Sequence, residues 1–324
     1  MTLVSVVLAS FNRLPVLELT IATVREELLG IDHEIIVVDG GSTDGAVQWL
    51  SAQKDIITIV QHNRGQWNGH PIRRRSWGYF MNLGFRCAQG KYICMISDDC
   101  LVVPSSIRNG IRRVEEESTR GVKVGAVAFY YRDFPTYEKY RVQYTLGNRL
   151  FVNHGLFLND ALRSVGYADE KNYMFCHGDG DLGLKLWNAG YVIIDSPDSF
   201  IEHLAHSNMN VRASNHALQH KDWDRYLEVW KGVCYDPDVD AIDGVKEQAY
   251  VDKTNTADLF RRVRVRHLIS NYIVLMRLGP KYLQSNEVPF DALVKRLAAR
   301  IRALLRGKWL VSGGSSRGRH YNKR

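Results

Sequence analysis

Short apolar segments alternate with helical segments through the first hundred residues, and this alternation constrains the fold more than any other feature. Four apolar runs have strand length and many β-branched residues: 3–9, 34–38, 56–60 and 91–96. Helical patterns separate them, one beginning near Pro15 and another covering 73–88. Strands that are joined through helices by short loops usually lie parallel. The sequence therefore predicts an α/β fold with a Rossmann-like, mostly parallel sheet flanked by helices.

The chain is predicted to divide into three parts. A strand at 124–131 and a helix near 181–189 continue the α/β pattern, so the first domain is expected to span 1–210. Residues 211–310 are predicted to form a mainly helical extension. A glycine- and serine-rich stretch then opens a basic tail, 311–324, which is predicted to be disordered.

The net charge of +8 is concentrated near the C-terminus. Residues 257–324 contain 16 Lys and Arg against 3 Asp and Glu, so the rest of the chain is net acidic. Within this region, 257–277 and 289–306 are basic and amphipathic. Helices of this kind can lie in an anionic membrane surface, where each cation contributes about 1 kcal/mol. The alternatives are helices packed on the first domain and a contact between copies in an oligomer.

The N-terminus and the cysteines indicate where the protein resides. The chain begins without a basic region ahead of an apolar stretch, and no run reaches the ~18 apolar residues of a spanning helix. Its five cysteines lack C-x-x-C spacing, which is typical of reduced thiols. We therefore expect a cytoplasmic protein, which the basic helices could hold at the inner face of the membrane.

Segments that carry polar residues follow three of the predicted strands. They are Ser10, Phe11, Asn12 and Arg13 after the first strand, Asp39 after the second, and Asp98 and Asp99 after the fourth. Ligands of open parallel sheets bind outside the carboxyl ends of the strands, so these residues should share one crevice. Asp98 and Asp99 have no basic neighbour in sequence, and a hard cation would relieve their repulsion. The sequence predicts a divalent metal, Mn²⁺ or Mg²⁺, with helix capping before Pro104 as the alternative.

Several motifs occur in the order and spacing of one known family. They are ASFNR at 9–13, VVDGGSTDG at 37–45, SDD at 97–99, VGYADE at 165–170, and Gly178-Asp179-Gly180-Asp181-Leu182 followed by Gly190-Tyr191. Together they resemble family-two glycosyltransferases over roughly residues 3–206. This resemblance implies a GT-A fold and hexosyl transfer from a nucleotide-sugar donor to an acceptor hydroxyl, with inversion.

The resemblance also implies roles for individual residues. Asp39 would recognise the base or ribose of the donor, and Phe11 would stack near the base, within a nucleotide site that includes Ser10, Asn12 and Arg13. Asp99, helped by Asp98, would bind the metal on the donor diphosphate. His203 would complete the metal site. We expected His203 and His206 to share a helix.

Asp179 would be the general base that deprotonates the acceptor hydroxyl. The chemistry needs such a base together with charge stabilisation on the leaving diphosphate. Gly178 stands where the family usually has a glutamate, so Asp181 is the competing candidate. The donor is expected to be a UDP-sugar, and the acceptor a glycan or a lipid-linked sugar in polysaccharide assembly.

Two alternatives to a glycosyltransferase follow from the same residues. A sugar nucleotidyltransferase would share the sheet and the acidic site, but it usually needs a glycine-rich basic loop after the first strand, and ASFNRLP lacks one. A non-enzymatic nucleic-acid-binding protein would use the basic tail. That class leaves the strand-end carboxylates without a role, so no nucleic acid is expected as a partner.

Overall fold

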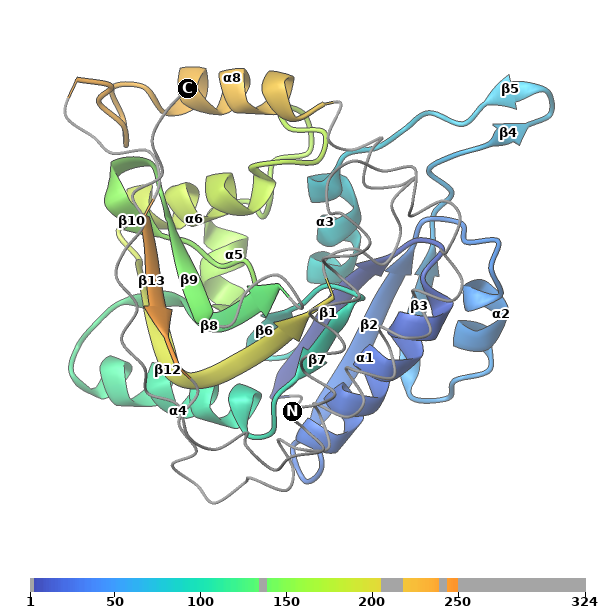
Figure 1. Cartoon of the computed structure of the whole chain (residues 1–324), viewed down its shortest axis with the longest axis horizontal. Helices are drawn as coiled ribbons and strands as arrows, with labels where there is room; N and C mark the ends of the chain where they lie inside the picture. Colours follow the sequence, from blue (N-terminus) through green and yellow to red (C-terminus); the bar gives the residue numbers. More distant parts are fainter. Residues whose placement is uncertain (1–2, 134–138, 205–217, 239–243, 250–324) are drawn as a thin grey trace, which may run out of the picture. The chain divides into compact units, whose positions relative to one another are not determined.

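The computed structural model describes residues 3–133, 139–204, 218–238 and 244–249, which all lie within one compact unit, 1–278 (Figure 1). The predicted basic helices and the tail lie outside the described residues. The boundary predicted near residue 210 stays a prediction. Among the helices that are described, none is long and apolar enough to cross a membrane.

The N-terminal half of the sheet is parallel, as the alternating pattern predicts. Its strands run in the order β6, β1, β2, β3. Their bounds are Val4–Ser10 for β1, His33–Asp39 for β2, Ile56–Val60 for β3 and Tyr92–Met95 for β6. Ser10 and Asp39 are paired in register at the ends of β1 and β2. The carboxyl ends of these strands therefore meet at one edge of the sheet.

Beyond β6 the sheet becomes mixed, because no α-helix is described between β8 and β11 along the chain. β11 (Gly155–Leu158) is antiparallel to both β6 and β8 (Val124–Asp133). β8 continues into β9 (Tyr140–Thr145), a short 3₁₀ turn (Leu146–Asn148) and β10 (Arg149–Leu150). After these short strands the chain re-enters the sheet at β11, antiparallel to β6 and β8. The parallel order expected from the first hundred residues therefore does not extend to β11.

A long strand, β12 (Val192–His203), pairs with both β7 (Cys100–Val102) and β8. It lies parallel to β8 and antiparallel to β7, which directly follows Asp98 and Asp99. A register shift between Ser196 and Phe200 interrupts its pairing with β8. In Figure 1, β12 crosses the molecule and brings its C-terminal end to β7. This pairing places residues near 203 beside residues near 100.

Helices cover both faces of the sheet. α1 (Leu14–Glu27), α2 (Ala46–Ser51) and α4 (Ser106–Thr119) pack on one face. α3 (Trp77–Cys87), α5 (Asn159–Ser164) and α6 (Gly178–Asn188) pack on the other. Apolar residues at helical spacing, such as Leu17, Ile21 and Val24, are fully buried against the strands. Both faces of the sheet are therefore covered, as its continuous apolar strands require.

Two elements beyond residue 210 pack with this unit. α8 (Gln219–Trp230) buries Tyr226 and Trp230 in a small cluster with Leu184 of α6. β13 (Gly244–Gln248) pairs antiparallel with β9 and so extends the sheet. A strand at this position was not expected from the mostly helical pattern. A short hairpin, β4 (Gln66–Trp67) and β5 (His70–Pro71), projects from the body with Trp67 75% exposed (Figure 1).

A buried ion pair fastens β8 to β12, and we expect its disruption to be strongly destabilising. Arg132 donates two hydrogen bonds to Glu202, at 2.7 and 2.6 Å, and Tyr140 donates a third to Glu202 at 2.5 Å. The side chains of Arg132 and Glu202 are 4% and 0% exposed. Arg132→Ala would leave a buried carboxylate without its cation, so we expect it to lower the free energy of unfolding by about 3–5 kcal/mol.

Urea denaturation of the purified variants would measure this effect. Arg112→Ala, which removes an exposed ion pair with Glu116, is the matched control and should cost about 0–1 kcal/mol. The double variant Arg132→Met/Glu202→Leu should be more stable than Arg132→Ala, because no charge remains buried. Equal stability of Arg132→Ala and the control would show that the pair does not fasten the strands.

Candidate active site

The ends of β1 and β2 are joined by a network of hydrogen bonds around Asp39. Asp39 is fully buried, and its Oδ1 accepts hydrogen bonds from the backbone N–H groups of Gly41 and Ser42 at 2.8 and 2.7 Å. Its Oδ2 accepts the hydroxyl of Ser42 at 2.7 Å. Both oxygens of Asp39 thus hold the turn that follows β2. The predicted contact of Asp39 with the base or ribose stays a prediction.

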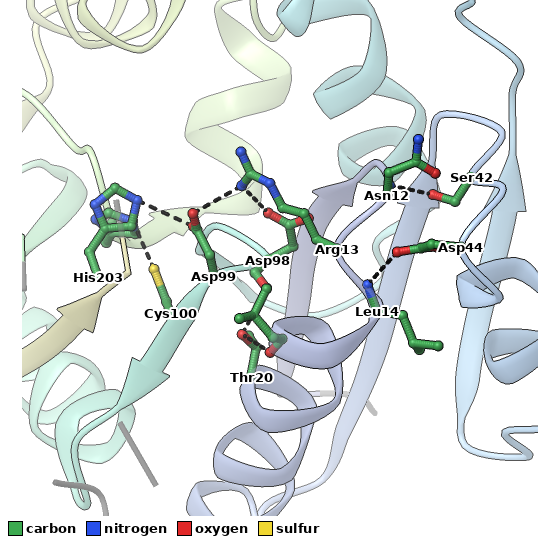
Figure 2. A network of polar contacts seen from close by, with 12 residues as sticks. Asn12, Arg13, Leu14, Thr20, Ser42, Asp44, Asp98, Asp99, Cys100 and His203 are labelled. Atoms are coloured by element: carbon green, nitrogen blue, oxygen red, sulfur yellow. Dashed lines mark hydrogen bonds and ion pairs between the residues drawn. The ribbon is translucent and has the colours of Figure 1, made fainter. Parts of the chain in front are cut away.

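The loop after β1 is attached to this turn. The N–H of Asn12 donates to Ser42 Oγ at 2.8 Å, and Asn12 Oδ1 accepts the N–H of Thr43 at 2.7 Å (Figure 2). Ser10 is buried, and its carbonyl accepts the N–H of Gly40 at 2.8 Å. The structure therefore brings Ser10, Asn12 and Asp39 together at one edge of the sheet, as the strand pattern predicts.

Close packing in this region depends on glycine. A Cβ at Gly40 would lie 3.1 Å from the Phe11 ring. Gly41 has a φ of +83°, and a Cβ there would lie 2.4 Å from the His62 ring. The Arg64 guanidinium lies 5.6 Å from the centroid of the Phe11 ring. Phe11 is partly exposed between these groups. It lies at the edge where we expect a nucleotide base, beside a cation that could contact phosphate.

Arg13 bridges the two acids that follow β6. One guanidinium nitrogen, Nη1, donates to Asp98 Oδ1 at 2.7 Å and to Asp99 Oδ2 at 3.0 Å (Figure 2). Asp98 and Asp99 are 3% and 2% exposed, and the carbonyl of Asp98 accepts the Thr20 hydroxyl from α1. No basic residue is adjacent to these acids in sequence. The fold supplies one from the first strand exit.

His203, the last residue of β12, contacts Asp99 from the other side. Its Nε2 lies 3.2 Å from Asp99 Oδ1, and its Nδ1 lies 2.6 Å from Asp133 Oδ1. Asp133 in turn accepts a hydrogen bond from Arg141 at 2.7 Å. The prediction that His203 lies on a helix is wrong, because it is the last residue of β12 and is paired with Cys100 of β7. His206 lies outside the described residues.

The charged side chains in this cluster shift one another's pKa values. Burial by itself would lower the pKa of His203, but Asp99 and Asp133 outweigh it and raise that pKa to about 10. Burial would raise the pKa of Asp99, but Arg13 and His203 hold it well below its usual range. Burial raises the pKa of Asp98, against the opposing effect of Arg13. Asp99 is therefore the anionic centre on which two cationic groups converge.

This arrangement fits a divalent metal ion. Carboxylate oxygens and imidazole nitrogen are the ligands that Mn²⁺ accepts, and Mg²⁺ is usually bound through one or two carboxylates. In the structure, the Arg13 guanidinium and the His203 ring both contact Asp99, where a metal would supply positive charge. Asp133 holds Nδ1 of His203, so Nε2 is the nitrogen directed at the site. Asp99 and His203, the two predicted metal ligands, therefore lie together.

Asp179 lies in the first turn of α6, where the helix dipole favours a negative charge. Its Oδ2 accepts a hydrogen bond from Asn153 Nδ2 at 3.1 Å, and its side chain is partly exposed. Burial raises its pKa. The pKa of Tyr131 is raised mainly by burial and then by the charge of Asp133, and the charge of Asp179 adds to this effect. The ring of Tyr131 packs against His203.

Asp181, the competing candidate for the base, occupies a different environment. It is 3% exposed, and its Oδ1 accepts hydrogen bonds from Tyr173 at 3.0 Å and Trp230 at 2.9 Å. Both partners belong to the apolar cluster between α6 and α8. Because Asp181 faces this cluster, it is less accessible to an acceptor than Asp179.

The loop between β10 and β11 contains two residues that the sequence did not single out. Asn153 contacts Asp179, and the next residue, His154, lies with Nε2 3.2 Å from Cys100 Sγ. Neither residue occurs in a recognisable motif. Cys100, the partner of His154, directly follows Asp99 and is the first residue of β7. This position was the one feature of the sequence that could have pointed to the contact. A single short loop therefore contacts both the candidate base and the metal side of the site.

The sheet, with acids at its strand ends and antiparallel strands added beyond β6, is a GT-A-like α/β fold. Residues 5–168, about half of the chain, match the glycosyl transferase family 2. The chain belongs to that family.

Two curated relatives are chondroitin synthases. The protein from Escherichia coli is 28% identical over 107 residues, which are 32% of this chain and 14% of the relative. The protein from Pasteurella multocida (strain Pm70) is 25% identical over 107 residues, 32% of this chain and 10% of the relative. The chain thus corresponds to a small part of the length of either relative.

Two solved structures are similar to this chain, and one of them is a mannosyltransferase. The mannosyltransferase PcManGT from Pyrobaculum calidifontis, in complex with GDP-Man and Mn²⁺, has a TM-score of 0.49 and 16% identity, with coverage of 94% of this chain and 87% of that one. TarS from S. aureus has a TM-score of 0.49 and 12% identity, with coverage of 70% and 44%.

Proposed function

We propose that this chain is a metal-dependent, inverting glycosyltransferase that transfers a sugar from a nucleotide-diphosphate-sugar, with UDP as the favoured nucleotide, to an acceptor hydroxyl. The observation that carries the proposal is the joint placement of a candidate base and a candidate metal site. Asn153 contacts Asp179, and the adjacent His154 packs against Cys100, next to Asp99. Family membership supports glycosyl transfer.

The donor would bind at the edge formed by the ends of β1, β2 and β6. Ser10, Phe11, Asn12, Arg13, Asp39 and Asp98 are the proposed nucleotide-binding residues. Asp99 and His203 would hold Mn²⁺ or Mg²⁺, which stabilises the negative charge that develops on the leaving diphosphate. Arg13 can contact the same phosphates, because its guanidinium already lies between Asp98 and Asp99.

Asp179 would accept the proton of the acceptor hydroxyl. A raised pKa suits this role, because a general base is most effective when its pKa is near the working pH. A single base without a second nucleophile is consistent with one displacement and inversion at the anomeric carbon. The similarity to chondroitin synthases supports a glycan acceptor in polysaccharide assembly, and a lipid-linked acceptor at the cytoplasmic face of a membrane is the alternative.

Isothermal calorimetry on the full chain would test the donor site. UDP, GDP, TDP and CMP would each be titrated with and without Mn²⁺. We expect micromolar binding of one nucleoside diphosphate that depends on the metal. Absence of binding by all four to a folded protein would contradict the donor site. The anomeric configuration of the product, determined by NMR with the active sugar nucleotide, would test inversion.

The pH dependence should report the environment of Asp179. The carboxylate form is the active base, so kcat/KM should fall as the pH drops through the raised pKa of Asp179. Asn153 stabilises the carboxylate by donating to Oδ2. Asn153→Ala removes this hydrogen bond, so we expect the acid limb of the pH–rate profile to move to higher pH. Asn172→Ala, which removes a similar hydrogen bond to Asp169, should leave the limb in place.

A further inference from the structure

We propose that Cys100, His154 and His203 form a binding site for a thiophilic divalent metal ion, with zinc as the ion that fits best. One potential ligand atom from each of these residues lies within 4.8 Å of the other two. This is the one such group of three or more His, Cys, Asp and Glu residues found in the part of the chain that the structure describes. The ligand set, one thiolate and two imidazoles, is softer than the carboxylate set proposed for the donor metal.

One spacing within the group is close to that of tetrahedral zinc, and the others lie within 4.8 Å. Zinc–nitrogen and zinc–sulfur bonds of 2.0–2.3 Å place neighbouring ligand atoms about 3.3–3.8 Å apart. Cys100 Sγ and His154 Nε2 are 3.2 Å apart, close to this length. His203 Nε2 and Asp99 Oδ1 are also 3.2 Å apart. Asp99 is not one of the three residues of the group, so the proposed set is Cys-His-His, with a fourth position for water or another ligand.

The backbone fixes two of the ligands opposite each other. Cys100 of β7 and His203 of β12 are paired residues in an antiparallel ladder. His154 is tied to β8, because its carbonyl accepts the N–H of Phe129 at 2.8 Å. Ligands on strands hold their positions better than ligands on free loops. The site is thus built into the sheet.

The surroundings orient His203 as a metal ligand. Asp133 contacts its Nδ1 at 2.6 Å, an arrangement in which a carboxylate fixes the ring and leaves Nε2 for the metal. Arg141 holds Asp133 in place at 2.7 Å. The same carboxylate–histidine arrangement serves the donor-metal proposal. His203 can therefore take part in only one of the two metal sites at a time.

His154 is otherwise unexplained. Its side chain is buried, with 1% of the residue exposed, and Nδ1 has no hydrogen-bond partner in the described structure. Nε2 contacts a thiol, which is a weak hydrogen-bond partner. A buried imidazole is costly without good partners. A metal ion between Nε2 and Cys100 Sγ would supply a strong interaction at this position.

Cobalt(II) provides a direct test on the metal-free full chain, because thiolate-bound cobalt gives a charge-transfer absorption and tetrahedral cobalt gives intense visible bands. We expect wild type to bind one Co²⁺ with both signals, and Zn²⁺ to displace it. Cys100→Ser should lose the charge-transfer absorption. Zinc affinity, measured by competition with a chromophoric chelator, should fall at least about 10–100-fold in Cys100→Ser and in His154→Gln.

Cys87→Ser is the matched control, since Cys87 lies on α3 outside the cluster, and it should behave as wild type. Circular dichroism would confirm that each variant folds, and His154→Gln keeps the test open if Cys100→Ser does not. The proposal is wrong if wild type shows no charge-transfer absorption, or if the absorption survives Cys100→Ser and disappears in Cys176→Ser. None of these readouts requires transferase activity or nucleotide binding.

One consequence rests on the proposed function. If His203 also serves the donor metal, zinc in this site should weaken Mn²⁺-dependent nucleotide binding by wild type, and Cys100→Ser should resist that effect. Cobalt binding without zinc inhibition would uphold the metal site and contradict the shared role of His203. Absence of both cobalt binding and zinc inhibition would contradict the Cys-His-His metal site and leave the proposed function standing.

Discussion

Asp179→Asn is expected to lower kcat by about 10²–10⁴-fold while leaving donor binding near its wild-type value. The substitution preserves the size of the side chain and its position in the first turn of α6, but an amide cannot accept the proton of the acceptor hydroxyl. Because Asp179 contacts Asn153 and none of the strand-end residues around Asp39, the nucleotide site should be unaffected. Transfer rates and calorimetric binding of the nucleotide would measure the two effects separately.

Asp181→Asn is the matched control for this prediction. Asp181 accepts hydrogen bonds from Tyr173 and Trp230 within an apolar cluster, so its substitution should reduce the stability of the α6–α8 contact. Thermal unfolding would detect that loss, and the folded variant should keep most of its kcat. A larger loss of kcat in Asp181→Asn than in Asp179→Asn, with both proteins folded, would reverse the assignment of the base.

The parallel half of the fold could be predicted because each strand is a separate apolar run. The predicted strand at 56–60 has the observed bounds Ile56–Val60, and those at 3–9 and 34–38 differ by one residue. The two central strands are nearly continuous apolar runs, as strands buried on both faces usually are, and the partly exposed edge strand Ile56–Val60 is a similar run, so their limits are visible in the sequence. The placement of Ser10 beside Asp39 followed from the parallel arrangement alone.

β12 was harder to predict, because its sequence is interrupted. Pro197 and Asp198 resemble a turn, and the strand has its register shift between Ser196 and Phe200. Its continuation to His203 depends on pairing with β7 and β8, which are distant in sequence. This tertiary pairing explains why His203 was assigned to a helix although its proximity to Asp99 was expected from the family resemblance.

Contacts between distant residues could not be predicted from local patterns. Arg13 reaches Asp98 across 85 residues, and His154 reaches Cys100 across 54. In both cases the contact exists because two strand ends or loops meet at one edge of the folded sheet. The sequence placed Arg13 and the carboxylates at that edge but did not indicate that Arg13 pairs with both acids. It likewise did not indicate that the thiol after Asp99 has an imidazole partner.

Asp99→Asn is expected to abolish the metal-dependent part of nucleotide binding and to lower kcat/KM by about 100-fold or more. Loss of a metal that stabilises the leaving diphosphate removes several kcal/mol of charge stabilisation, and about 1.4 kcal/mol corresponds to a tenfold change in rate. Asp99 is the acid on which both Arg13 and His203 converge, so no neighbouring carboxylate occupies the same position. Calorimetry with and without Mn²⁺ would measure the effect.

Two comparisons make this prediction specific. Asp160→Asn removes an exposed acid on α5 and should leave nucleotide binding unchanged. The pKa of His203 should fall in metal-free Asp99→Asn, because one of the two carboxylates that raise it has lost its charge. NMR titration of the histidine ring would detect this change in a folded protein without any ligand. A lowered pKa of His203 together with unchanged Mn²⁺-dependent nucleotide binding would show that Asp99 belongs to the charge cluster but does not hold the metal, and the search for the metal ligands would move to other residues.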